Sequence, residues 1–126
     1  MTSMFLLFSH SLTDEQIEDA KNSLGVDEFI SLPNSLQQAW SSVPPELDGV
    51  REYAKPFYEF LSYRAMKGDF VLVSGDFGLC YLLVQWCKAH DLIPIYATTK
   101  RDTEEIETTK GIERKSTFKH VRFRRY

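Results

Sequence analysis

The sequence predicts an α/β protein of the Rossmann-like type, a three-layer α/β/α sandwich with a mainly parallel sheet. Short apolar runs, such as Phe70 to Val73, are typical of strands buried on both faces. Segments with helical periodicity separate these runs, and the order β-α-β-α-α-β-α-β-β makes most of the strands parallel. The 126 residues suffice for one domain with its own core, spanning residues 1–126.

The first elements are predicted by clear local signals. Met4 to Phe8 is wholly apolar and predicts a central strand. Thr13 and Gln16 form a capping box that predicts the start of a helix, and Gly25 is a natural stop for it. Val26 to Leu32 then predicts a second strand.

Proline residues divide the middle of the chain. Pro33 ends the second strand and can begin a short helix, and the turn-rich segment 41–48 follows that helix. The segment from about Leu47 to Lys67 predicts another helix, with a kink or a break at Pro56. The aromatic residues of these two helices could stack on bases, but aromatic residues at helical spacing favour a core: Trp40, Tyr53, Phe57 and Tyr58.

The last third predicts a helix, a strand, a connection and a final strand. The helix runs from about Phe77 to His90, and the strand from Leu92 to Ala97 contains Pro94, which favours a place at or near the sheet edge. The polar segment 101–113 predicts a loop or short helix. Residues 116–126 alternate as an edge strand does, with one face formed by Phe118, His120, Arg122, Arg124 and Tyr126.

Composition indicates a protein of the cytoplasm. Hydrophobic residues make up 43% and charged residues 26%, and no apolar run is long enough to span a bilayer. The N-terminus lacks the features of a signal peptide. Cys80 and Cys87 lie about two helical turns apart, too far for a disulfide, and are expected to be core thiols.

Charge is distributed unevenly along the chain. Residues 1–109 carry a balance of −9, and residues 110–126 a balance of +6. A basic segment on an acidic body indicates a local anionic ligand rather than duplex DNA. The alternative is a tail that pairs with the protein's own carboxylates.

Three loops follow predicted strands and should lie along one edge of the sheet, where α/β proteins bind ligands. Hydroxyl groups, glycine amides and cations in these loops suit a phosphate-bearing ligand. The candidate binding residues are Ser9, Ser11, Ser74, Gly75, Asp76, Phe77, Gly78, Thr98 and Thr99, with Arg122 of the last strand. The candidate catalytic residues are His10, Lys100 and Arg101.

Each loop also has a purely structural explanation. Ser74 to Gly78 could be a tight turn with Asp76 as a helix N-cap, His10 could be a surface histidine, and Thr98 to Arg101 could be a solvated loop. No acidic cluster lines the predicted edge beyond Asp76, so a two-metal nuclease site is not expected. We expect no metal and no cofactor. Cleavage of RNA by its own 2′-hydroxyl, held in line by the protein, fits these residue types better. His10 would act as acid or base, and the two cations would stabilise the phosphoryl charge.

Four segments in the same order resemble the small ring nucleases of type III CRISPR systems: Phe5 to Thr13, Gly75 to Gly78, Ile93 to Arg101 and Phe118 to Tyr126. That family is similar to the CRISPR-associated Rossmann-fold (CARF) sensor domains. The resemblance implies a homodimer that binds cyclic tetra-adenylate across its two-fold axis and cleaves it without metal to di-adenylates with 2′,3′-cyclic phosphate ends. It also implies that the three strand-end loops face the ring. The long segment 33–67 could cover this ligand or form the dimer surface.

Overall fold

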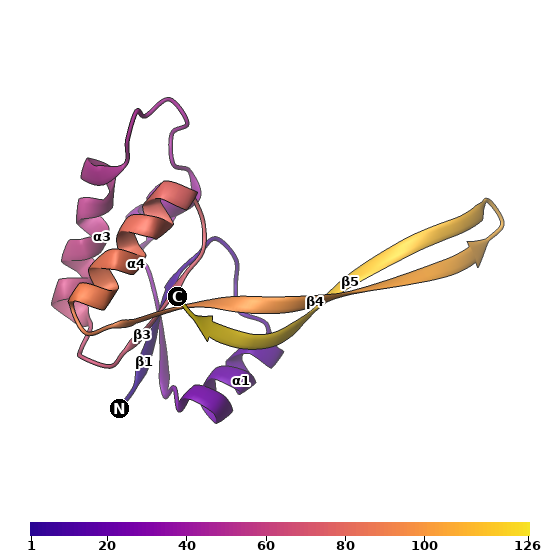
Figure 1. Cartoon of the computed structure of the whole chain (residues 1–126), viewed down its shortest axis with the longest axis horizontal. Helices are drawn as coiled ribbons and strands as arrows, with labels where there is room; N and C mark the ends of the chain where they lie inside the picture. Colours follow the sequence, from indigo (N-terminus) through magenta and orange to yellow (C-terminus); the bar gives the residue numbers. More distant parts are fainter.

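The computed structural model describes residues 1–126 as a five-stranded sheet with helices on both faces (Figure 1). The elements in chain order are β1 (Ser3–Leu7), α1 (Asp14–Leu24), β2 (Glu28–Ser31), α2 (Asn34–Ser41), α3 (Arg51–Arg64), β3 (Phe70–Val73), α4 (Phe77–Ala89), β4 (Ile93–Thr108) and β5 (Gly111–Arg125). The strand order is β2-β1-β3-β4-β5, with four parallel strands and β5 antiparallel to β4. The predicted fold class and the C-terminal edge strand are confirmed.

The sheet reverses its order at β1, which positions the strand ends for ligand binding. The chain adds β2 on one side of β1 and then crosses to add β3 on the other side. Open α/β sheets bind ligands in the crevice outside the carboxyl ends of the strands at such a reversal. The edge where β1 and β3 end is therefore the first place to look for a site.

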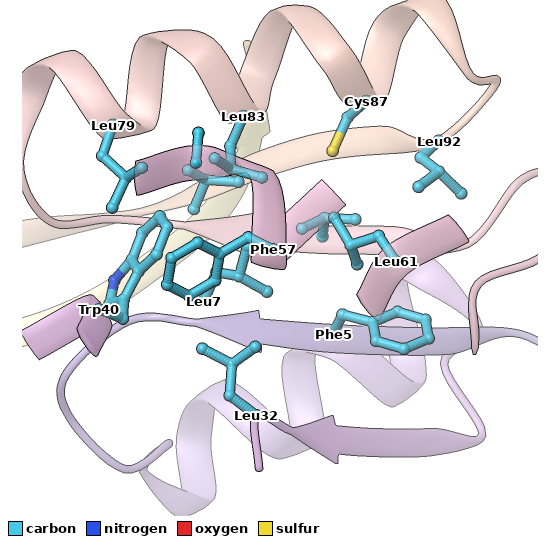
Figure 2. Close-up of a cluster of buried hydrophobic side chains, with 13 residues drawn as sticks. Phe5, Leu7, Leu32, Trp40, Phe57, Leu61, Leu79, Leu83, Cys87 and Leu92 are labelled. Carbon is cyan, nitrogen blue, oxygen red and sulfur yellow. The ribbon is translucent and has the colours of Figure 1, made fainter. Parts of the chain in front are cut away.

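Two hydrophobic clusters cover the two faces of the sheet. The larger joins β1 and β3 to α2, α3 and α4, and the smaller lies beneath α1. In the larger cluster Trp40 is 2% exposed and meets the Phe57 ring edge-on, with centroids 5.3 Å apart (Figure 2). These two aromatic residues therefore belong to the core, as helical spacing favoured.

Local signals in the first half of the chain are confirmed. The Thr13 hydroxyl accepts a hydrogen bond from the Gln16 amide at 3.2 Å, and the Gln16 side chain accepts one from the Thr13 amide at 2.9 Å. Gly25 ends α1 with a φ of 68°, a conformation that favours glycine. The break that Pro56 predicts does not occur, because α3 continues through it.

The segment 101–113, which the sequence predicts to be a loop or short helix, is instead part of two long strands. β4 continues to Thr108, and β5 returns from Gly111 (Figure 1). Acidic residues of β4 face basic residues of β5 across the ladder, including Glu105 and Arg114 at 3.7 Å. Such cross-strand pairs stabilise a ribbon. The polar segment alone does not indicate a strand, because the residues that pair with it come later in the sequence. We call residues 99–120 the arm.

A β-bulge lies where the arm joins the body. Thr98 pairs with Arg122 and Thr99 pairs with His120, which leaves Val121 without a partner. The Thr98 hydroxyl donates to the Arg122 carbonyl at 2.8 Å and accepts from the Arg122 amide at 3.2 Å. The extra residue reverses the alternation of β5, so the predicted single face from Phe118 to Tyr126 is wrong.

Both cysteines are free thiols in α4, as predicted. Burial raises the pKa of Cys87 to about 12 and that of Cys80 to about 11, so both stay protonated at neutral pH. Pro94 lies in β4, the strand next to the sheet edge, which agrees with its predicted place near the edge. No helix combines the length and the apolar character that crossing a bilayer requires.

Candidate functional site

The carboxyl ends of β1 and β3 lie side by side, as the sequence predicts. The Ser74 amide donates to the Leu7 carbonyl at 3.0 Å, which ties the loop after β3 to the end of β1. The loops that start at Ser9 and Ser74 are therefore neighbours. The third predicted loop, Thr98 to Arg101, is wrong, because β4 does not end there but enters the arm.

Ser9, His10 and Ser11 line a pocket of about 500 Å3 that reaches across β2 to α1 and α2. Its floor is apolar, and its rim carries neutral hydroxyl and amide groups, including Gln37. The Gln37 amide donates to the Phe8 carbonyl at 3.0 Å and to the Ser41 hydroxyl at 3.1 Å. No Lys or Arg side chain lines this pocket, so His10 is the only group in it that can carry positive charge.

The loop after β3 is largely accounted for by packing. The Asp76 carboxylate accepts from the Leu79 amide at 3.0 Å and caps α4, as its structural explanation predicts. The Trp40 indole donates to the Ser74 carbonyl at 2.9 Å. A Cβ on Gly75 would lie 2.9 Å from the same indole nitrogen, so this glycine lets the loop rest on Trp40. At Gly78, a Cβ would lie 3.3 Å from a Val50 methyl.

A second pocket, of about 350 Å3, opens at the end of β3 between α4 and the last strand. Its lining is mostly apolar and consists of Ser74, Gly75, Phe77, Cys80, Tyr81, Val84 and Tyr126. Phe77 is 95% exposed at its mouth, and Tyr81 lies one helical turn further along α4. Large apolar side chains that gather on a surface mark a binding site more often than chance exposure. The exposed rings of Phe77 and Tyr81 therefore indicate a contact surface for a ligand or partner.

Aromatic rings and a cation extend this pocket along the sheet. The Tyr126 hydroxyl donates to the Val73 carbonyl at 2.5 Å, and its ring lies 4.8 Å from that of Tyr96. The Arg124 guanidinium lies over the Tyr96 ring at 5.5 Å and donates to its hydroxyl at 3.0 Å. Burial raises the pKa of Tyr126 to about 12, so its hydroxyl stays a donor at neutral pH. We call Phe77, Tyr81, Tyr96, Arg124 and Tyr126 the aromatic surface.

The predicted residues of the third loop lie at the base of the arm. Lys100 stands directly opposite Lys119, and none of the ion pairs in the structure involves either one. Like charges directly opposed destabilise a ribbon unless an anion lies between them. Arg101 donates to the Ser116 hydroxyl at 3.1 Å and lies 5.9 Å from the centre of the Phe118 ring.

Arg122, also predicted to bind, lies beside α1. It lines a groove with Asp19, whose carboxyl has a lowered pKa. Partial burial alone would raise the Asp19 pKa, but hydrogen bonds from Ser23 and His120 outweigh it. His120 is 5% exposed at its side chain, and its Nε2 lies 2.7 Å from the carboxylate. Two residues of the basic segment thus contact the protein's own carboxylates, Arg114 with Glu105 and His120 with Asp19, in part as the alternative explanation of its charge predicted.

The structure does not gather all the predicted residues in one cavity. Two separate pockets are lined by Ser9 to Ser11 and by Ser74, Gly75 and Phe77, and neither pocket includes Lys100 or Arg101. Four further residues were missed: Tyr81, Tyr96, Arg124 and Tyr126. The helical spacing of Phe77 and Tyr81 was a usable signal, and Tyr96 lay within a predicted strand. The bulge hid that Arg124 and Tyr126 lie on the other face from Phe118 and His120. No three His, Cys, Asp or Glu side chains are grouped as metal ligands would be.

Fold and site define an α/β sandwich protein with a ligand-sized aromatic pocket at its strand ends and a long β-ribbon arm. The chain belongs to the MJ1673 family, whose model matches residues 2–124. It is 51% identical over 126 residues to the uncharacterized protein MJ1673 of Methanocaldococcus jannaschii, covering 100% of this chain and 98% of that protein. No solved structure matches the chain.

Proposed function

We propose that this protein is a ring nuclease of the cytoplasm that binds cyclic tetra-adenylate and cleaves it to linear di-adenylates with 2′,3′-cyclic phosphate ends. In that role it ends the signal of a type III CRISPR response. The proposal combines the four sequence segments that resemble ring nucleases with the reversal of strand order at β1.

The aromatic surface beside unpaired cations is the observation that carries the proposal. Adenine bases stack on aromatic rings, and phosphates bind Lys and Arg, so a small adenylate ring needs both kinds of side chain close together. Tyr126 and Tyr96 lie on the same side of the sheet as Arg124, and alternation along β4 puts Lys100 on that side as well. Lys100 and Lys119 would hold a phosphate between them.

The nucleophile of the proposed reaction is the substrate's own 2′-hydroxyl. The 2′-oxygen attacks the adjacent phosphorus, the bond to the 5′-oxygen breaks, and the 5′-oxygen leaves with a proton. Lys100 and Arg101 would stabilise the charge on phosphorus, and His10 would move the proton. Ser9 and the amides from Gly75 to Gly78 would fix the phosphates.

A homodimer is part of the proposal. Two copies about a two-fold axis present the same groups to a ring that has the same symmetry. His10 and Lys100 line no common pocket in one chain, so cleavage would use groups from both copies. The same separation also favours a second candidate, a binding module that sequesters the ring without cleaving it.

Incubation of the pure protein with cyclic tetra-adenylate in EDTA, followed by chromatography of the products, tests both candidates. Di-adenylate products support the nuclease, whereas an intact ring that is released on denaturation supports sequestration. Lys100→Ala should slow cleavage by about a hundredfold. Lys88→Ala, an exposed cation at the far end of α4, is the matched control and should leave the rate unchanged. A ring that is neither bound nor cleaved rules out both.

A further inference from the structure

The aromatic surface continues onto the part of the arm nearest the body, on the same side of the sheet. Tyr96 and Arg124 are cross-strand partners, and alternation along β4 puts Lys100 on their side. Lys119 stands directly opposite Lys100, about 13 Å further along the ribbon than Tyr96. From the pocket outward, this side therefore carries the Tyr126 ring, then Tyr96 with Arg124, and then the two lysines.

The cations and rings of this stretch are free to contact a ligand. None of the ion pairs in the structure involves Arg124, Lys100 or Lys119. The Arg124 guanidinium donates to the Tyr96 hydroxyl through Nη1, which leaves its other N–H donors for a phosphate oxygen. Tyr81 is 62% exposed and Tyr126 is 42% exposed. Exposed rings beside cations are typical of surfaces that bind single-stranded nucleic acid, with bases on the rings and phosphates on the cations.

Charge on the outer part of the arm limits the length of this stretch. The next charged side chains on the same side of the ribbon are Asp102 and Glu104 of β4, with Lys115 and Glu113 of β5. Three of these four are acidic, so phosphates that continued outward would be repelled. A long strand or a duplex along the whole arm therefore fits poorly, whereas a strand of a few nucleotides fits well.

We propose that one chain binds a short stretch of linear single-stranded RNA, about five nucleotides long, between the pocket and the lysine pair Lys100 and Lys119. The hydroxyls of Ser74 and Tyr81 line the pocket, where they can bond the 2′-hydroxyl of a ribose. Stacking on aromatic rings makes the binding tolerant of base sequence. This inference goes beyond the proposed function, because a linear strand needs the groups of one chain only and no bond has to be cleaved.

Fluorescence anisotropy of labelled oligouridylates of three to twelve nucleotides, with the full-length protein at low salt, tests the proposal. Affinity should rise with length to about five nucleotides and then level off, and it should fall as salt is added. DNA of the same sequence and duplex RNA should each bind at least tenfold more weakly. Equal affinity for the DNA would overturn the assignment to RNA, and no binding of any oligouridylate would overturn the site itself.

Exposed side chains allow matched variants. Tyr81→Ala and Lys119→Ala should each weaken binding about tenfold, because one removes a stacking ring and the other a phosphate contact. Tyr63→Ala, which removes an 88% exposed ring from α3, and Lys88→Ala should bind as the wild type does. Circular dichroism checks that each variant is folded. Controls that weaken binding as much as Tyr81→Ala and Lys119→Ala would overturn the proposal.

Removal of the acidic limit gives a test by gain of binding. Asp102→Asn with Glu104→Gln keeps the shape of both side chains and removes their charge, so affinity should continue to rise from five to twelve nucleotides. An unchanged length limit would contradict the proposed path along the arm. Cyclic tetra-adenylate that stays intact, together with length-limited binding of linear RNA, would exclude the nuclease but support this proposal.

Discussion

The contact between Gly75 and Trp40 leads to a prediction that separates packing from ligand binding. If Gly75 is needed because the loop rests on the indole, Gly75→Ala should destabilise the protein with no ligand present. The added Cβ would lie 2.9 Å from the indole nitrogen, closer than real Cβ contacts. It would also strain the 2.9 Å bond from the indole to the Ser74 carbonyl.

The expected loss is about 2 kcal/mol in the free energy of unfolding, from overpacking together with a weakened hydrogen bond. Urea denaturation followed by tryptophan fluorescence and circular dichroism measures it. Trp40→Phe removes the clashing atom but leaves the Ser74 carbonyl unpaired, at a cost of about 2–3 kcal/mol. The double variant should therefore lose about 1 kcal/mol less than the sum of the single variants. Additive losses, or a Gly75→Ala protein as stable as wild type, would refute the packing explanation and favour a ligand role for the glycine.

Three further predictions concern titration, burial and the bulge. Asp19→Asn should cost about 1 kcal/mol at neutral pH. The pKa of Asp19 is lowered in the folded state, so its stabilising contribution is complete above its ordinary pKa of 3.8 and is lost as the pH falls below that value. The unfolding curves of wild type and variant should therefore converge in acid. A difference in stability that stays constant with pH would contradict this prediction. Cys87 should resist iodoacetamide at pH 8 until the protein unfolds, as mass spectrometry can show, and rapid labelling of the native protein would show that the thiol is accessible. Thr98→Val should cost about 1 kcal/mol in thermal unfolding, because both hydrogen bonds that it makes across the bulge are lost, whereas Thr108→Val near the arm's turn should cost less.

Local sequence signals predicted the body of the fold well. The capping box at Thr13, the stop at Gly25 and the apolar strand Phe70 to Val73 each depend on residues close in sequence. The arm could not be predicted in this way, because its strands depend on pairing across the ladder, as between Glu105 and Arg114 nine residues later. Prolines were a mixed guide, since Pro33 precedes α2 as expected but Pro56 lies within an unbroken α3.

The candidate site was predicted in part for the same reason. Ser9 and Ser74 follow the ends of neighbouring parallel strands, and strand topology alone brings their loops together. Tyr126 lies on the face of the pocket, opposite to that of His120, because one unpaired residue between them offsets the two-residue repeat of β5. A strict two-residue repeat placed Tyr126 on the same side as His120, whereas His120 lies against α1.

The unpaired Val121 offsets the two-residue repeat of side chains along β5 by one residue. It puts His120 and Tyr126, which are six residues apart, on opposite faces of the sheet, against α1 and beside α4. The arm could gain or lose matched pairs of residues, one on each strand, and the pocket should stay intact. Such changes do not alter the pairing of β4 with the residues that follow Val121. Loss of Val121 alone would give a regular ladder with the same cross-strand pairs, so Tyr126 would keep its place beside α4. Neither the length of the arm nor the extra residue at its base therefore determines the pocket, which depends on the pairing of β4 with the residues that follow Val121.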